Sequence, residues 1–174
     1  MKDSYEIERK FLVKKLPDDL ESYPYHELSQ AYLSGEPVIR IRRSDSDYIL
    51  TYKAGGLMIR KEVELPLTEA SFAHLLTKAD GLVISKRRYI IPTFMETEDG
   101  VLDLKIELDI FKGDLEGFIL AEVEFPSKNT ATSYTPPEWL GKEVTDDPLF
   151  HNVNLSRLNP VDRKTFLAQF AYKE

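Results

Sequence analysis

The stretch Glu6-Ile7-Glu8-Arg9-Lys10 decides the fold of this chain. Successive side chains of a β-strand point to opposite faces, so Glu6, Glu8 and Lys10 share one face while Ile7 lies on the other. Arg9 falls on the apolar side. The stretch is therefore predicted to be a strand with one charged face and one largely apolar face.

The same alternation recurs in later segments that are also predicted to be strands. It occurs in Arg40-Ile41-Arg42, Glu62-Val63-Glu64, Lys86-Arg87-Arg88, Glu107-Leu108-Asp109 and Glu122-Val123-Glu124, and Lys53 follows Leu50-Thr51-Tyr52 in a similar setting. An ordinary wet strand face mixes Thr, Ser and Gln with charges, because these residues suit a pleated surface better than Glu or Lys. A single charged pair is more often solvated surface. The whole set has acidic and basic pairs on separate segments. This arrangement favours a fold in which the charged faces of the strands lie against one another rather than on the solvent-exposed surface.

Placed side by side, these strands gather acids and bases on one face and apolar side chains on the other. The acids are Glu6, Glu8, Glu62, Glu64, Glu107, Asp109, Glu122 and Glu124, and the bases are Lys10, Arg40, Arg42, Lys53, Lys86 and Arg88. A closed barrel with its charged face inward and helices packed on its apolar outside satisfies both faces. The sequence therefore predicts an α+β fold around a wet tunnel, which suits a polyanion held with divalent cations.

The connections between the expected strands are short enough for antiparallel hairpins. A helix is predicted to begin after the N-cap Thr68 and to extend to Ala79, and a terminal helix is predicted to begin at Asn159-Pro160. Residues 127–137 are predicted to be a loop, followed by a short helical piece through Trp139 and Leu140. The strands are expected at residues 4–13, 28–34, 38–43, 48–53, 58–65, 82–92, 102–111 and 118–126.

Composition narrows the class of protein. The 174 residues fit one domain, 1–174, and the absence of cysteine excludes disulfides, zinc thiolates and thiol nucleophiles. The net charge of −7 argues against nucleic acid as a partner. The N-terminus lacks the long apolar run of a secretory signal or membrane span, so a cytoplasmic location without a membrane partner is expected.

The chain resembles the CYTH family, also called triphosphate tunnel metalloenzymes, over nearly its whole length. Residues 6–11 look like the family's N-terminal ExExK signature, and the later charged pairs fall in the expected order. Residues 107–111, 121–126 and 141–145 look typical of the bacterial, inorganic triphosphatase-like branch. The resemblance implies a closed antiparallel eight-stranded tunnel with helices outside, and a triphosphate-containing substrate acted on with Mg²⁺ or Mn²⁺.

The resemblance also implies roles for the charged residues. One or two metal ions would be held by Glu6, Glu8, Asp109, Glu122 and Glu124, since both metals favour carboxylate oxygens. Phosphate oxygens would be bound by Lys10, Arg40, Arg42, Lys53, Lys86 and Arg88. The expected catalytic residues are Lys10, Glu62, Glu64, Glu107 and Tyr32. The competing interpretation is that the bases only neutralise a buried acidic lining.

The leading functional hypothesis is a metal-dependent triphosphatase that acts on tripolyphosphate, and on nucleoside triphosphates more weakly. A class IV-type adenylyl cyclase is the alternative enzyme, although the His-Phe pair usual before ExExK in those cyclases is missing here. A non-catalytic polyphosphate or nucleotide sensor is the alternative from another class, and a homodimer is left open. His26, His74 and His151 show no metal-ligand spacing and are expected to be surface or packing groups.

Overall fold

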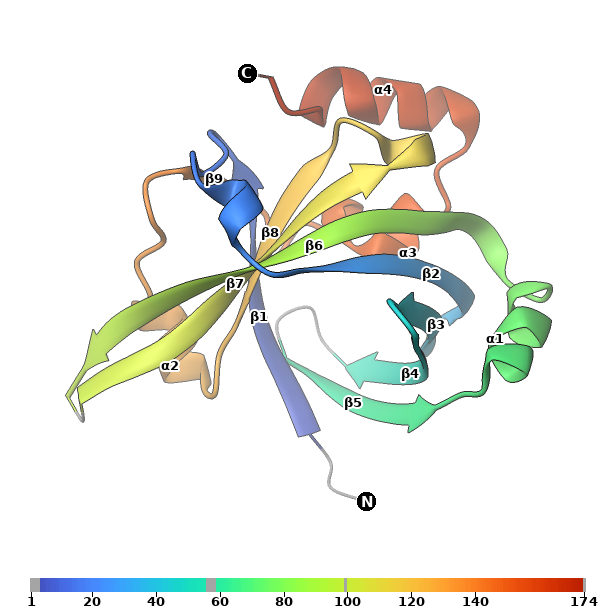
Figure 1. Ribbon diagram of the computed structural model, residues 1–174, viewed down its shortest axis with the longest axis horizontal. Coiled ribbons are helices and arrows are strands. Elements are labelled where there is room, and N and C mark those ends of the chain that lie inside the picture. Colours follow the sequence, from blue (N-terminus) through green and yellow to red (C-terminus); the bar gives the residue numbers. More distant parts are fainter. Residues whose placement is uncertain (1–3, 56–58, 99, 174) are drawn as a thin grey trace.

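A computed structural model describes residues 4–55, 59–98 and 100–173 of the chain (Figure 1). Its described part contains one antiparallel sheet of nine strands. The strands are β1 (Ser4–Val13), β2 (Tyr25–Gly35), β3 (Val38–Ser44), β4 (Asp47–Gly55), β5 (Ile59–Pro66), β6 (Asp80–Thr97), β7 (Gly100–Lys112), β8 (Ile119–Glu124) and β9 (Leu140–Glu143). Their order in the sheet is β5-β4-β3-β2-β6-β7-β8-β1-β9.

The first strand pairs with three other strands in turn. Its first residues, Ser4–Ile7, pair with β5, its middle pairs with β8 from Glu8↔Glu124 to Leu12↔Leu120, and its end pairs with β9. In the sheet order β5 is the first strand and β1 is the eighth, so the β1–β5 pairing brings these two distant members of the sheet together. The sheet has nine strands rather than the eight expected, because β9 adds to β1; a fully closed eight-stranded tunnel stays a prediction.

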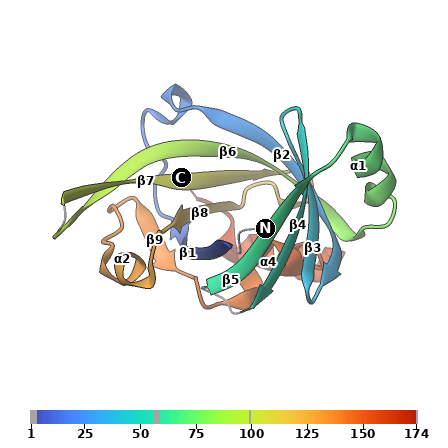
Figure 2. The ribbon, with the colours of Figure 1, turned by 90° about the horizontal axis from the view of Figure 1, so that it is seen from below.

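Four α-helices and three short 3₁₀ helices accompany the sheet in the described residues. The α-helices are α1 (Glu69–Leu76), α2 (Lys128–Ser133), α3 (Asn152–Leu155) and α4 (Pro160–Phe170), and the 3₁₀ helices are η1 (Leu20–Ser22), η2 (Gly113–Leu115) and η3 (Pro148–Phe150). Figure 2 shows α1 beside β3 and β4 and α2 on the other side of the molecule. No helix in the described ranges is long and apolar enough to cross a membrane.

Three hydrophobic clusters lie between the sheet and these helices. The first includes Phe11, Tyr89, Leu108, Val123 and, from α2, Ala131. The second joins Tyr32, Phe111, Phe118 and Leu120 to Phe150, Leu155 and Phe166 of η3, α3 and α4. The third packs Phe72 of α1 on Ala31 and Ile41. Much of the apolar side of the sheet is thus buried under helices, as the sequence pattern predicted, whereas Leu65, Phe94 and Val101 are exposed.

Two segments between β8 and η3 differ from the sequence prediction. Residues 128–133 form α2 instead of a loop, because the Ser127 hydroxyl accepts from the Thr130 backbone N–H and the Thr130 hydroxyl accepts from the Ser127 N–H. The predicted helical piece at Trp139 and Leu140 is also wrong. Leu140 begins β9, which pairs with β1 at Val13.

The hairpin of β6 and β7 is longer than predicted. The expected strand stopped at Pro92, whereas β6 continues to Thr97 and pairs with β7 as far as Gly100. Proline lacks a backbone N–H and is tolerated where a strand has no neighbour on that side. Here β2 pairs with β6 only as far as Tyr89, so Pro92 costs the sheet no hydrogen bond on that side. Met58, the expected start of β5, lies outside the described residues.

Candidate functional site

The charged faces of the strands surround a cavity of about 380 Å³. Of the predicted site residues, Glu6, Glu8, Lys10, Tyr32, Arg40, Arg42, Lys53, Glu62, Glu64, Lys86, Arg88, Glu107, Glu122 and Glu124 line it. They come from the eight strands β1 to β8, with Tyr32 on β2 and the charged residues on the other seven. The expected convergence of both signs of charge in one hollow is therefore observed.

Lys10 joins the first and eighth strands inside the cavity. Its Nζ lies 2.9 Å from Glu8 Oε1 and also donates to Glu122 Oε1. Burial alone lowers the pKa of an ammonium group, but Glu122 and Glu8 outweigh it and hold the pKa of Lys10 above its ordinary value. Lys10 therefore stays charged and neutralises two carboxylates.

Asp109 is fully buried beneath the lining of the cavity. Arg88 binds it with two hydrogen bonds, Nε to Oδ1 and Nη2 to Oδ2, each of 2.6 Å, and Lys86 Nζ also donates to Oδ2. Arg88 further contacts Glu107 and Glu122. Asp109 does not itself line the cavity, unlike the other predicted metal ligands. Its role as a metal ligand stays a prediction, and its oxygens would first have to exchange these partners.

Lys86 is a buried ammonium group that is less completely compensated. Burial lowers its pKa, and the positive charge of Arg88 adds to this, while Asp109 and Glu122 act in the opposite direction. The net effect lowers the pKa of Lys86 to about 8. Its charge is therefore the most sensitive to pH among the lysines of the cavity whose pKa shift is resolved.

Arg40 and Arg42 have weaker partners than these lysines. Arg42 Nη2 lies 3.3 Å from Glu64 Oε1, and Arg40 Nη2 donates to the Thr51 hydroxyl at 3.0 Å but is 3.8 Å from Glu62. The Nε atoms of both arginines are shielded from solvent and donate to no group in the described residues. Burial and the nearby charges of Arg40 and Arg88 lower the pKa of Arg42. An added anion would relieve this excess of positive charge.

At two positions of the cavity the carboxylates have an excess of negative charge. Burial first, and then Glu8, raise the pKa of Glu6, even though Lys53 Nζ lies 2.5 Å from Glu6 Oε2. Burial and the neighbouring Glu107 raise the pKa of Glu124. These like charges would be relieved by a divalent cation, and the oxygen donors match Mg²⁺ or Mn²⁺ in kind. Among the described residues, however, no three such groups are already arranged as a metal site.

Sequence reasoning missed several residues of the cavity. His151 was expected at the surface or in local packing, but it is buried and lines the cavity together with Asn152 and Val153. These residues lie outside the strand pattern, so no alternation could place them. Strand parity does place Lys105 on the same face as Glu107, and Lys105 also lines the cavity, where its Nζ lies 3.0 Å from Glu107 Oε1.

Tyr32 is held by a second residue that the sequence did not single out. The Gln30 side chain is buried, and its Nε2 donates to the Tyr32 hydroxyl at 2.8 Å. Both residues share one face of β2, so strand parity could have identified Gln30. The register of β2 shifts beside Tyr32 on both neighbouring strands, an irregularity that can redirect a side chain.

The chain is similar to known inorganic triphosphatases. It is 37% identical over 155 residues to one from Nitrosomonas europaea, covering 87% of this chain and 96% of the relative. It is 31% identical over 161 residues to one from Acetivibrio thermocellus, covering 89% and 94%. A crystal structure of an inorganic triphosphatase matches with a TM-score of 0.62 at 34% identity, covering 89% of this chain and 96% of that one. No family model matches the sequence.

Such similarity over nearly the whole of both chains defines the class of protein. The chain belongs to the CYTH, or triphosphate tunnel metalloenzyme, family. Within that family its similarity is to the inorganic triphosphatases, as residues 107–111, 121–126 and 141–145 indicated.

Proposed function

We propose that this protein is a divalent-metal-dependent triphosphatase that hydrolyses the terminal phosphoanhydride of inorganic tripolyphosphate. The observation that carries the proposal is the cavity of about 380 Å³, lined by carboxylates, lysines and arginines. Its size and charge suit a short polyanion. The similarity to inorganic triphosphatases supports tripolyphosphate as the substrate, with nucleoside triphosphates as poorer ones.

The arginines and lysines bind the phosphate oxygens. Arg40 and Arg42 contact the polyanion first, because carboxylates hold their guanidinium groups less closely than they hold the lysines and Arg88. Lys10, Lys53, Lys86 and Arg88 then exchange part of their carboxylate contacts for phosphate contacts. The same bases that neutralise the acidic lining thus also form the substrate site, which combines the two interpretations of these residues.

Carboxylates released in that exchange would hold the metal. Glu6, Glu8, Glu122 and Glu124 form the ligand set, and Asp109 joins it if its contacts with Lys86 and Arg88 open. Mg²⁺ or Mn²⁺ held by these residues would supply a Lewis acid for the phosphoryl oxygens and would lower the pKa of water.

The remaining acids and Lys10 act on the reaction itself. Glu62, Glu64 and Glu107 orient a water molecule toward the terminal phosphorus and accept its proton. As the new P–O bond forms, the bridging P–O bond breaks and its electron pair leaves with diphosphate. Lys10 offsets the charge on that leaving group, and Tyr32 donates a hydrogen bond to the substrate. The products are orthophosphate and diphosphate.

Eight strands form the working tunnel in this proposal. The pairing of Ser4–Ile7 with Ile59–Glu62 supports a ring of β1 to β8, with β9 as an addition outside it. A closed ring would keep the charged faces away from bulk water, where their interactions with phosphate would be weaker.

The experiment is an assay of phosphate release from tripolyphosphate with Mg²⁺ or Mn²⁺. We expect hydrolysis by the unaltered protein and a loss of ~100-fold or more in kcat/KM for Glu6→Gln and Glu124→Gln, because each removes charge from the metal set. Glu138→Gln, at an exposed position, is the matched control. Absence of phosphate release with either metal contradicts the proposal. Cyclic AMP and diphosphate from ATP would identify a cyclase, and binding without turnover a sensor.

A further inference from the structure

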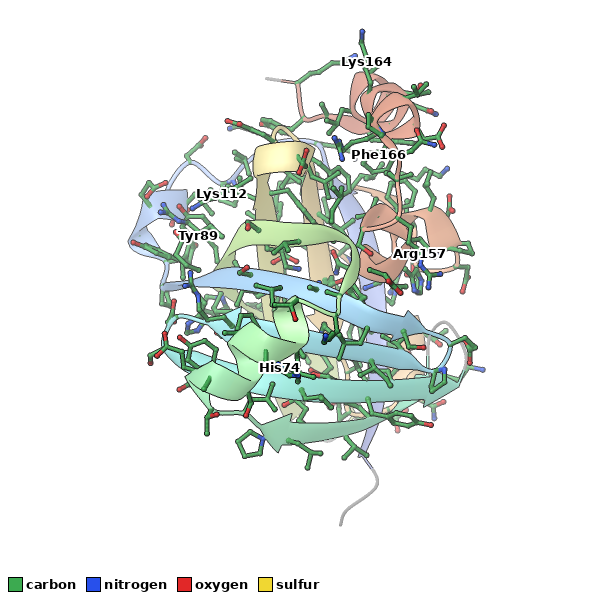
Figure 3. The ribbon with its side chains drawn as sticks, turned by 90° about the vertical axis from the view of Figure 1, so that its right-hand side faces the viewer. His74, Tyr89, Lys112, Arg157, Lys164 and Phe166 are labelled. Atoms are coloured by element: carbon green, nitrogen blue, oxygen red, sulfur yellow. The ribbon has the colours of Figure 1, made fainter. Side chains whose placement is uncertain are left out.

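One end of the cavity is formed by a segment that comes after the sheet in the sequence. His151, Asn152 and Val153, here named the end wall, line the cavity together with Tyr32 and Val38, which lie where β2 ends and β3 begins. Figure 3 shows Arg157, a few residues beyond the end wall, beside this end of the strands. The end wall is therefore part of the site although it carries none of the paired charges.

The end wall is fixed to the sheet on several sides. Phe150 and Leu155, which flank it, are buried in the second hydrophobic cluster. The backbone N–H of Leu82 donates to Ser156 O at 2.7 Å. A Cβ at Gly81 would lie 2.3 Å from the same oxygen, and Gly81 has a positive φ of 72°. The end wall thus cannot move away without breaking core packing, so it limits how far a substrate can enter.

Asn152 presents an unused polar atom within this end wall. Its Oδ1 is shielded from solvent and accepts no hydrogen bond from any group of the described residues. Buried polar atoms are nearly always paired, so an exception at a cavity points to a group that arrives there. An amide has one acceptor and two donors, and rotating it exchanges the oxygen for the NH₂ group. It can therefore meet either a protonated or an ionised phosphate oxygen.

We propose that Asn152 is a substrate-binding residue that contacts the innermost terminal phosphate of a linear polyphosphate. This inference rests on the proposed function. Because the end wall lines the cavity beside Tyr32 and Val38, a linear substrate that fills the cavity would place its chain terminus against it. A neutral amide suits this position because it adds no charge beside the polyanion. A cyclic phosphate has no terminus to place there.

Binding of tripolyphosphate to the folded protein tests the proposal by calorimetry in the presence of EDTA, together with KM in the metal-dependent assay. We expect Asn152→Asp to raise Kd and KM at least ~10-fold, since a carboxylate would repel the terminal phosphate, and Asn152→Ala to raise them ~3-fold or more. Asn129→Asp makes the same change at an exposed position of α2 and should have no effect. Trimetaphosphate should compete ~10-fold more weakly than tripolyphosphate.

The outcomes separate this proposal from the proposed function. No binding and no hydrolysis by the unaltered protein reject the proposed function. Normal hydrolysis by the unaltered protein, with unchanged Kd and KM in folded Asn152→Asp, rejects the role of Asn152. Thermal unfolding checks that the variants fold. If neither Asn152 variant folds, Asn152 is a structural residue and the proposal is also overturned.

Discussion

Two glutamates on β8, only two residues apart, have opposite electrostatic environments. Lys10, Arg88 and Lys86 overcome the effect of burial on Glu122 and hold its pKa well below the ordinary value. Burial and neighbouring carboxylates raise the pKa of Glu124 instead. Ionised Glu122 therefore stabilises the fold, whereas ionised Glu124 destabilises it and is available for a cation.

The same substitution at these two positions should consequently change stability in opposite directions. Glu122→Gln should lower the free energy of unfolding by about 3 kcal/mol near neutral pH, because it leaves buried Lys10 and Arg88 without a carboxylate. Glu124→Gln should raise the melting temperature of the metal-free protein while it suppresses hydrolysis. Urea unfolding and thermal melts in EDTA measure both. Equal loss of stability in both variants would contradict this account.

The pH dependence of the two variants follows from the same pKa shifts. A lowered carboxyl pKa gives stability that is present above the unfolded pKa and is lost as pH falls through the folded pKa. A raised pKa gives a penalty that grows as pH rises from the unfolded pKa to the folded pKa. Glu122→Gln should therefore reduce the loss of stability on acidification below about pH 4. Glu124→Gln should remove the loss of stability that ionised Glu124 causes above about pH 4.

At the scale of elements, Arg9 connects β1 to β9 and to α2 on the apolar side of the sheet. Its guanidinium donates to Glu143 of β9 and to the carbonyl oxygens of Ala131 and Tyr134, at and just beyond α2. Thr145 Oγ1 donates to Glu143 and accepts from the Lys10 backbone N–H, both within hydrogen-bond distance. The one charge on the apolar side of β1 is thus a clamp between β1, β9 and α2.

Removing this clamp should destabilise the protein without removing any group from the cavity. Arg9→Met keeps much of the apolar stem but deprives two carbonyl oxygens and Glu143 of a donor, so we expect a loss of about 2–4 kcal/mol in the free energy of unfolding. Arg43→Met, at an exposed position of β3, is the control. Urea denaturation measures the loss. A difference below about 0.5 kcal/mol between the two variants would show that the clamp contributes little.

For the whole molecule, strand alternation predicted most of the charged residues that share the cavity, although Asp109 lies beneath its lining and Lys105 is an additional member. The parity of Glu6, Arg40 or Glu122 is a local property, and a one-residue error would have moved each set to the other face. The end wall could not be predicted in this way, because His151 and Asn152 reach the cavity through tertiary packing of α3. Strand β9 was missed because its four residues are held by contacts with β1 and have no pattern of their own.

The position of β1 also has a consequence for how the chain is made. This strand is synthesised before β8 and β9, yet it pairs with β8 at Glu124 and with β9 at Glu143. Local hairpins such as β3–β4 can form during synthesis, but the N-terminal strand has to wait for residues more than a hundred positions later. Such high contact order predicts slow, late completion of the sheet, after β8 and β9 have left the ribosome.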